Sequence, residues 1–102
     1  MLRHIVLTRF RDDVDDSTIA DISDGLAQVA ERLPVASGFV GGRSNSPEDL
    51  ERGYTHGFTI DFDDHRALAA YAGDPEHRRF GAQLVANAVD GRDGILVVDL
   101  EF

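Results

Sequence analysis

The chain has 102 residues, a length that fits one domain and excludes most two-domain arrangements. With 10 basic and 19 acidic residues its net charge is −9, so nucleic acid and anionic membrane surfaces are poor partners, because phosphates need basic patches. It has no cysteine, which excludes a disulfide scaffold, a thiol nucleophile and a zinc–thiolate site.

The N-terminal stretch MLRHIVLTRF predicts a strand over residues 2–10. Alternation places one set of residues on a single face, namely Leu2, His4, Val6 and Phe10. Ile5 and Leu7 lie on the other face, so both faces need cover. Arg3 interrupts the apolar run, which argues against a secretion signal, and no stretch approaches the roughly 20 apolar residues of a membrane helix. We therefore expect a cytoplasmic protein.

A polar stretch follows, in which Asp16 or Ser17 can cap a helix. Apolar residues then repeat at spacings of three and four, at Ile19, Ile22, Leu26, Val29 and Leu33. This period predicts an amphipathic helix that packs one face on a core. Pro34 ends it, because proline lacks the backbone donor that a helix interior needs.

The middle of the chain predicts two strands joined by a polar connection. ASGFVGGRS, residues 36–44, is a weak strand whose glycines suggest a bulge, and the connection at 45–53 is the segment expected to be mobile. YTHGFTIDF, residues 54–62, alternates cleanly. One of its faces carries His56, Phe58, Ile60 and Phe62, opposite Gly57, Thr59 and Asp61.

The next stretch predicts a helix in two segments. Asp63 or Asp64 can cap the first segment, which carries Tyr71 on its apolar side. Asp74–Pro75 interrupts it, since the residue before a proline resists helical geometry and proline suits the first helical position. Asp74 is then the expected cap of the second segment, which runs to about Val89.

The apolar run at residues 95–102 predicts a final strand. The order strand, helix, strand, strand, helix, strand is that of the ferredoxin-like βαββαβ fold, an α+β architecture with helices on one face of a four-stranded antiparallel sheet. The other face is expected to carry Ile5, Leu7, Thr59, Ile95 and Val97. A second copy packed sheet to sheet would bury this patch, so we expect a homodimer through it.

The side chains that could do chemistry are three histidines and a tyrosine. If the apolar strand faces are the covered ones, His4 and His56 point into the layer where the helices pack. Tyr71 faces the same layer, and His77 lies in the first turn of the following segment. Two interpretations remain open. Tyr71 and His77 form an acid–base pair at a pocket, or all four are structural groups with satisfied polar atoms.

A metal site built from His4, His56 and a carboxylate lacks support, because there is no ligand pair at helical spacing and no HExxH motif. The chain also has no GxGxxG after a strand, no P-loop and no GxSxG. Nucleotide binding and serine hydrolysis are therefore unsupported, and we expect neither a metal nor a cofactor.

Three stretches, RHIVLTRF, GYTHGFTIDFDD and AAYAGDPEHRRF, together resemble the stress-responsive dimeric A/B barrel (Dabb) domain family. The resemblance covers nearly the whole chain, so residues 1–102 are interpreted as a single domain of this kind. Its most telling signature is Tyr71, Pro75, His77 and Phe80. The resemblance implies a dimeric α+β barrel, in agreement with the apolar second face of the sheet.

One enzymatic branch of that family, similar to the plant olivetolic acid cyclase, closes a linear polyketide by aldol condensation without a cofactor. The resemblance to it implies that Tyr71 and His77 are catalytic. The strand histidines match as well, which implies a substrate-binding set of His4, His56, Phe58, Phe62 and Phe80. The expected ligand is a small polyketide-like or aromatic carbonyl compound, with His77 as the general base near neutral pH.

The chain departs from the family pattern at Asp74, where a histidine often precedes the proline. The Asp74 anion favours a protonated His77 and the helix N-terminus disfavours it, so the sequence leaves this balance open. Two other functions also remain open. The protein is a non-catalytic dimer used in stress response or assembly, or it is a monooxygenase of a related dimeric-barrel family, with or without haem.

Overall fold

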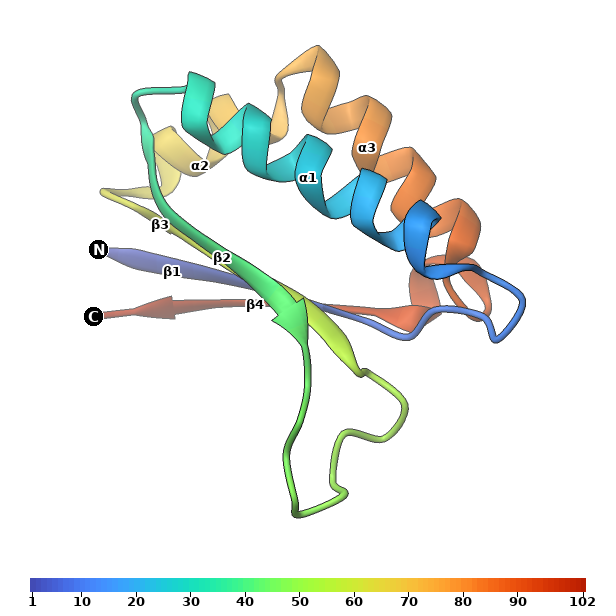
Figure 1. The fold of residues 1–102 in the computed structure, drawn as a ribbon. Helices are drawn as coiled ribbons and strands as arrows, with labels where there is room; N and C mark the ends of the chain where they lie inside the picture. The colour runs from blue at the N-terminus through green and yellow to red at the C-terminus, as the bar shows by residue number, and fades with distance from the viewer.

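The computed structural model describes residues 1–102, and Figure 1 shows its arrangement. The elements follow in the order β1 (Leu2–Thr8), α1 (Asp16–Arg32), β2 (Ala36–Arg43), β3 (His56–Phe62), α2 (His65–Ala72), α3 (Pro75–Asn87), the short 3-10 helix η1 (Gly91–Gly94) and β4 (Ile95–Glu101). The ferredoxin-like βαββαβ prediction is confirmed, with the second helix in two segments. None of the helices is both long and apolar enough to cross a membrane.

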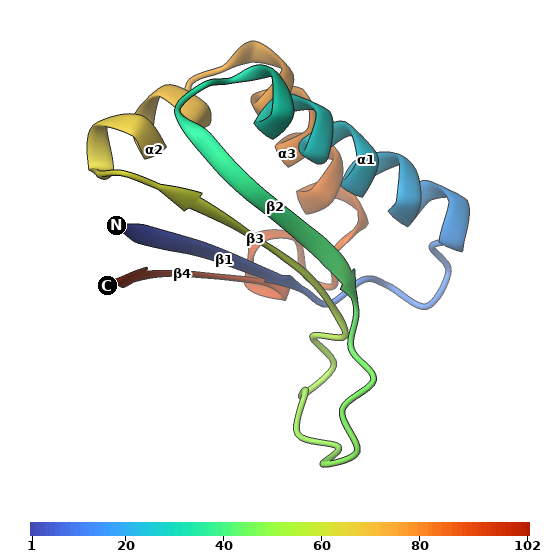
Figure 2. The ribbon, with the colours of Figure 1, turned by 60° about the vertical axis from the view of Figure 1, so that its left-hand side comes forward.

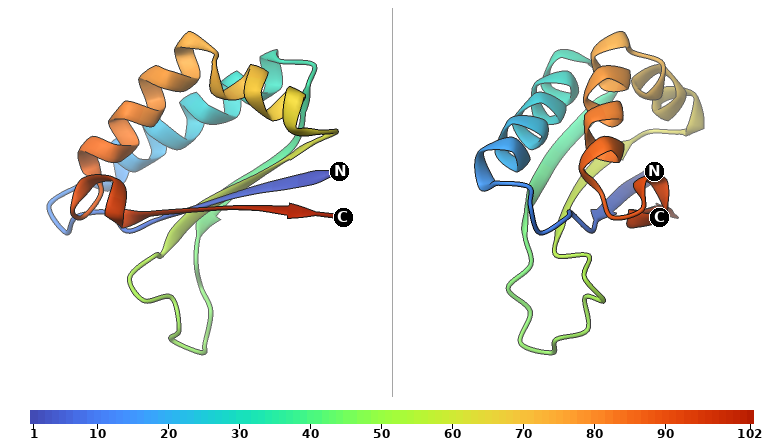
Figure 3. Two further views of the ribbon diagram at one scale, coloured as in Figure 1. Left: turned by 180° about the vertical axis from the view of Figure 1, so that it is seen from behind. Right: turned by 90° about the vertical axis from the view of Figure 1, so that its right-hand side faces the viewer.

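The four strands form one antiparallel sheet in the order β2-β3-β1-β4. All three helices lie on the same face of this sheet, and the two termini lie side by side at one end (Figures 1 and 2). In the end view, α1 lies on the β2 side of the molecule and α3 lies beside it (Figure 3). The helix-covered face therefore encloses the core, and the opposite face is left open.

An aspartate caps the N-terminus of each of the three helices. Its carboxylate accepts hydrogen bonds from backbone N–H groups that lack a partner within the helix. The Asp15 carboxylate accepts from Thr18 N at 2.8 Å, so the prediction of Asp16 or Ser17 as the cap of α1 is wrong by one position. Asp64 caps α2, one of the two predicted residues. Asp74 caps α3 as predicted, since its side chain accepts from the backbone of Glu76 and His77.

The predicted irregularity in β2 is present, because the pairing with β3 shifts between Ser37 and Val40. Gly38 lies inside this bulge with a φ of 64°, a left-handed conformation that glycine adopts without a Cβ clash. The shift places Phe39 on the helix side, where its ring stacks on that of Phe58 at 5.3 Å between centroids. The bulge thus supplies an aromatic side chain to the core from an otherwise glycine-rich strand.

The structure corrects the predicted facing of β4. Ile95 pairs with Thr8 and Val97 pairs with Val6, so both residues lie on the helix-facing side of the sheet. The prediction that Ile95 and Val97 belong to the open face is therefore wrong. The physical reason is that the ILVV run is apolar at every position, so alternation cannot fix its phase, and only the pairing with β1 decides it.

The open face is apolar and uncovered. Its exposed large side chains are Leu7, Val40, Leu96, Val98 and Leu100. Arg3 and Asp61 form a two-point ion pair on the same face, with nitrogen–oxygen distances of 2.8 and 2.9 Å. A patch of this kind is unusual on the surface of a monomer.

Beneath the helices, Ile22, Leu26 and Val29 of α1 pack on Phe58 and Ile60 of β3 as the predicted apolar period requires. Two helices approach closely at Gly25 of α1, where an added Cβ would lie 2.2 Å from the ring of Phe80 on α3. The absence of a side chain at that position is what allows Phe80 to sit against α1.

Candidate functional site

A cavity of about 920 Å³ lies on the helix-facing side, between α3 and the half of the sheet formed by β1 and β4. Its polar lining comes from His4 on β1, His77 and Arg78 on α3, and Arg92 in η1. Most of the remaining wall is apolar, and includes Val6, Phe58, Leu84, Val85, Ile95 and Val97. The cavity therefore combines an apolar body with a few polar groups, the usual composition of a small-molecule site.

The imidazole of His77 is held in one tautomer. Its Nδ1 atom lies 3.1 Å from the carbonyl oxygen of Ala72, and because a carbonyl can only accept, Nδ1 donates the proton. The lone pair is then on Nε2. Burial lowers the pKa of His77, and the positive charge of Arg78 adds to this, whereas the hydrogen bond to Ala72 and the charge of Asp74 oppose it. At neutral pH this ring is an unprotonated base.

The question left open at Asp74 is answered by its neighbours. Arg32 of α1 donates to the Asp74 carboxylate at 2.9 Å, so the negative charge near His77 is paired with a positive one. The same contact lowers the pKa of Asp74. The carboxylate therefore acts mainly as a helix cap and a tie to α1, and burial decides the protonation of His77.

His4 has a partner that the sequence analysis missed. Its Nδ1 atom lies 2.7 Å from Oδ1 of Asp99 on β4, so Nδ1 donates to the carboxylate and Nε2 is free. The pairing of β1 with β4 places these two residues directly opposite each other. Ile95, Val97 and Asp99 alternate along β4, so the sequence could have identified Asp99 as a partner of His4 only if it had shown which face of the sheet these residues occupy.

Tyr71 is fully buried, and its ring packs against three other rings. The centroid distances are 4.3 Å to His77, 5.2 Å to Phe62 and 6.1 Å to His4. Its hydroxyl has no hydrogen-bond partner, and burial raises the pKa of Tyr71, so the group remains a neutral phenol. The structure thus brings Tyr71, His77 and His4 together, with ring contact rather than a hydrogen bond between Tyr71 and His77, but Tyr71 itself belongs to the lining of neither cavity.

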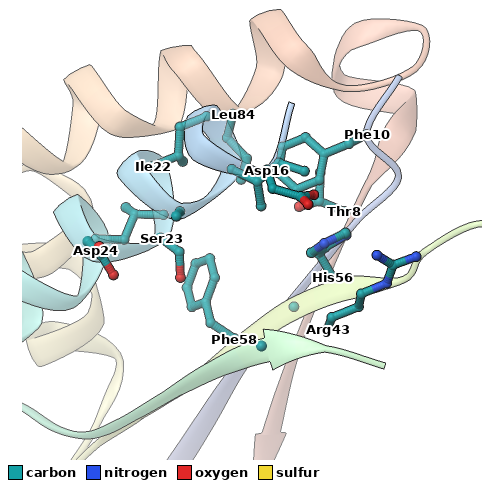
Figure 4. A pocket seen from close by; sticks show the side chains of 15 residues that line it. Thr8, Phe10, Asp16, Ile22, Ser23, Asp24, Arg43, His56, Phe58 and Leu84 are labelled. Carbon is teal, nitrogen blue, oxygen red and sulfur yellow. The ribbon is translucent and has the colours of Figure 1, made fainter. Parts of the chain in front are cut away.

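His56 lies elsewhere, in a second cavity of about 380 Å³ between α1 and the ends of β2 and β3 (Figure 4). Its ring packs edge-on against Phe10 at 5.3 Å, and Arg43 is its cross-strand partner. Burial lowers the pKa of His56 and the positive charge of Arg43 adds to this, whereas Asp16 opposes it. Neutral His56 and charged Arg43 therefore supply polar groups to a different pocket.

The separation of the two strand histidines follows from the pairing of β1 and β3. His4 is opposite Ile60 and His56 is opposite Thr8, four positions further along, which is about 13 Å at the usual rise of a strand. The two rings therefore cannot meet at one ligand atom. No group of three or more potential metal-ligating side chains converges anywhere in the structure.

The three candidate phenylalanines occupy different positions. Phe58 lines both cavities together with Leu26 and Leu84, so these side chains form a shared wall. Phe62 is buried behind Tyr71 and His4 and belongs to the lining of neither cavity. Phe80 packs against α1 and is also absent from both linings.

Comparison with known proteins agrees with this architecture. The family model described as the stress responsive A/B barrel domain matches residues 2–102. The stress-response A/B barrel domain-containing protein HS1 of Arabidopsis thaliana is 30% identical over 98 residues, which span 96% of this chain and 86% of HS1. It is therefore a relative along nearly the whole chain.

Two solved structures give the likeness in three dimensions. A dimeric ferredoxin-like protein of unknown function from Jannaschia sp. CCS1 is 38% identical, with a TM-score of 0.93 over 99% of this chain and 98% of its own. The hydroxynitrile lyase from Passiflora edulis has a TM-score of 0.84 over 97% of this chain and 90% of its own. At 20% identity that second likeness concerns the fold alone.

Proposed function

The chain belongs to the stress-responsive A/B barrel domain family, and on that premise we propose that it is a homodimeric protein that binds a small apolar carbonyl compound and acts on it as a cofactor-independent lyase or cyclase. One observation carries this proposal. The large cavity holds two imidazoles whose Nδ1 atoms are engaged and whose Nε2 atoms are free, and the buried neutral phenol of Tyr71 packs behind their rings.

The homodimer rests on the open face of the sheet. An exposed patch that includes Leu96, Val98 and Leu100 needs cover, and a second copy packed on it would bury the same residues of both protomers. The Jannaschia protein, which shares 38% of its sequence with this chain, is described as dimeric. We therefore propose sheet-to-sheet association through Ile5, Leu7 and Thr59 with this β4 set.

In the proposed reaction, Nε2 of His77 removes a proton from the carbon next to a carbonyl group. Burial keeps His77 unprotonated near neutral pH, as a general base needs to be. The electrons of the broken C–H bond move to the carbonyl oxygen and form an enolate. In this proposal the carbonyl oxygen reaches past the rings of His4 and His77 to the buried Tyr71 hydroxyl, which has no other partner and donates a hydrogen bond to it.

For a cyclase, the enolate carbon then attacks a second carbonyl of the same molecule, forming a carbon–carbon bond. The resulting alkoxide takes the proton back from Nε2 of His77, which restores the base. A lyase runs these steps in reverse, starting from a hydroxyl proton and breaking the carbon–carbon bond. Both reactions need only a base, a donor and a dry cavity.

The remaining residues of the site have supporting roles in this proposal. His4, held by Asp99, orients the ligand through its free Nε2 atom, and Phe58 forms the apolar end wall. Phe62 packs behind His4 and Tyr71 and Phe80 packs against α1, while His56 serves the second cavity. The fold relative from Passiflora edulis is named a lyase, which supports the capacity of this fold for such chemistry by analogy only.

The proposal is tested by following the exchange of α-protons of 4-phenyl-2-butanone in D₂O by proton NMR. The wild-type protein is expected to accelerate exchange, and His77→Ala to lose about 100-fold or more of that acceleration. His65→Ala is the control, since His65 is exposed at the start of α2. Binding of the ketone without faster exchange would indicate a non-catalytic binding dimer, and absence of binding would overturn the proposal.

A further inference from the structure

We infer that the ligand of the large cavity carries a carboxylate group, which Arg78 and Arg92 bind at the cavity rim while the carbonyl part of the ligand reaches His77 and His4. This inference rests on the proposed function. It narrows the substrate class from apolar carbonyl compounds in general to apolar keto acids.

The first support is the charge of the cavity lining. The chain has 19 acidic and 10 basic residues, yet the charged residues of the lining are Arg78 and Arg92, with no aspartate or glutamate. Cavities lined by one sign of charge concentrate ligands of the opposite sign. In a protein of net charge −9 this local reversal favours an anionic ligand.

The second support is that neither arginine is already paired. Arg78 and Arg92 take part in none of the five ion pairs of the structure. The acidic side chains near the start of α3 are engaged elsewhere, since Asp74 binds Arg32 and Glu76 binds Arg79. Both guanidinium groups are therefore free to bind a ligand.

The acidic residues close to Arg92 also leave its guanidinium group unpaired. Asp90 and Asp93 flank it in sequence, but their side chains do not line the cavity and form no ion pair with it. Asp99 does not line the cavity either, and its carboxylate is bound to His4. No carboxylate of the chain thus occupies the position proposed for the ligand.

The placement of Arg78 fits a ligand that spans the cavity. Arg78 follows His77 in α3, and both side chains line the same space. The guanidinium is a planar donor that binds a carboxylate through two parallel hydrogen bonds. A carboxylate at the exposed rim would leave the apolar part of the ligand between α3 and the β4 residues Ile95 and Val97.

The test is calorimetric titration of the full-length protein with 4-oxo-4-phenylbutanoate and with its neutral analogue 4-oxo-4-phenylbutanamide. The two differ only in the charged group. We expect the wild-type protein to bind the acid about tenfold more tightly or better, because hydrogen bonds to a charged partner are the stronger ones. The variant Arg78→Gln/Arg92→Gln is expected to bind the two compounds equally.

Two control variants locate the effect. Arg66→Gln removes an exposed arginine of α2 that is outside both cavities, and Arg43→Gln removes the arginine of the second cavity. Both are expected to keep the preference for the acid. Circular dichroism and thermal melting of all variants verify that the fold is retained.

The outcomes separate this inference from the proposed function. Equal affinity of the wild-type protein for acid and amide would overturn the carboxylate assignment and leave the proposed carbonyl site standing. Loss of the preference in Arg43→Gln, with the double variant unaffected, would also overturn it by placing the acid in the other cavity. If neither compound binds, the proposed function and the inference both fail.

Discussion

His4 and Asp99 lie directly opposite each other on neighbouring strands, with 2.7 Å between Nδ1 of the imidazole and the carboxylate. They are 95 positions apart in the sequence, so only the closure of β4 onto β1 brings them together. The contact fixes which nitrogen of His4 carries the proton. The pairing of β4 with β1 therefore determines which nitrogen of His4 faces the cavity without a proton.

We predict that Asp99→Leu changes the tautomer of His4. Without the carboxylate, Nδ1 loses the acceptor that keeps it protonated, and the population protonated at Nε2 rises. Nitrogen-15 NMR of the imidazole measures this directly. The α-proton exchange rate is expected to fall about tenfold or more, because His4 then presents a different ring atom to the ligand that it orients. Unchanged imidazole shifts would show that the carboxylate does not set the tautomer.

We predict that Tyr71→Phe leaves stability unchanged or raises it by up to about 1 kcal/mol. The buried hydroxyl has no partner, so its removal relieves a desolvation cost rather than breaking a hydrogen bond. The same change should abolish most of the proposed catalysis. Tyr71→Ala is the contrast, and is expected to cost about 3–5 kcal/mol through the cavity that it leaves. Urea unfolding measures both, and a loss above about 1 kcal/mol in Tyr71→Phe would reveal a hidden partner.

We predict that stability falls as the pH drops from about 7 to 5, before most carboxylates titrate. The pKa values of His77 and His56 are lowered in the folded state, chiefly by burial. Between the lowered pKa and the ordinary value of about 6.5, the unfolded chain binds more protons, so stability is complete above that window and is lost as pH falls through it. Urea midpoints at pH 8, 7, 6 and 5 measure the effect.

The variants His77→Gln and His56→Gln control this prediction, because each should flatten the pH dependence by removing one of the two groups. A wild-type protein that is equally stable at pH 7 and pH 5 would contradict the assignment of neutral, buried imidazoles.

We predict opposite effects of the same substitution at two helical glycines. Gly25→Ala should destabilise by about 1–3 kcal/mol, since the new Cβ would lie 2.2 Å from the ring of Phe80. Gly81→Ala should stabilise by up to about 1 kcal/mol, because nothing lies within 4 Å of its Cβ and alanine favours a helix. Thermal or chemical unfolding compares them. Equal effects at both positions would mean that α1 and α3 are less closely packed than the structure indicates.

We predict that two adjacent residues of β4 differ in their effect on assembly. Val98→Lys introduces a charge on the open face and is expected to give a monomer at concentrations where the wild-type protein is a dimer. Val97→Lys changes the helix-facing side and is expected to remain dimeric. Light scattering after size exclusion distinguishes the two. Monomeric wild-type protein, or dimeric Val98→Lys together with monomeric Val97→Lys, would contradict the proposed interface.

Local chemistry made much of the fold predictable. The Asp74–Pro75 step combines a cap with a residue that starts helices, so the break between α2 and α3 could be placed without any knowledge of tertiary contacts. The period of apolar residues in α1 likewise decides which side packs on the sheet. Each signal is carried by residues that are close together in the sequence, so it can be recognised without the tertiary fold.

Long-range relations could not be predicted in this way. The first four residues of β4 are all apolar, so their pattern does not show which of them face the helices. Ile95 and Val97 were therefore assigned to the wrong face, and Asp99 was missed as the partner of His4. Similarly, His4 and His56 share a sheet face but not a pocket, because the pairing of β1 with β3 sets them four positions apart. These features depend on strand alignment, which alternation within one strand does not report.

The wall formed by Leu26, Phe58 and Leu84 has a consequence for how this protein can diverge. The three side chains separate two hollow spaces, and none of them supplies a titrating group or a polar atom to either. Replacing Phe58 with a small residue would join the spaces and admit a longer molecule, while the contact between His4 and Asp99 stays in place. The dimensions of the accepted molecule and the reaction performed on it can therefore evolve independently, through different residues of the same short fold.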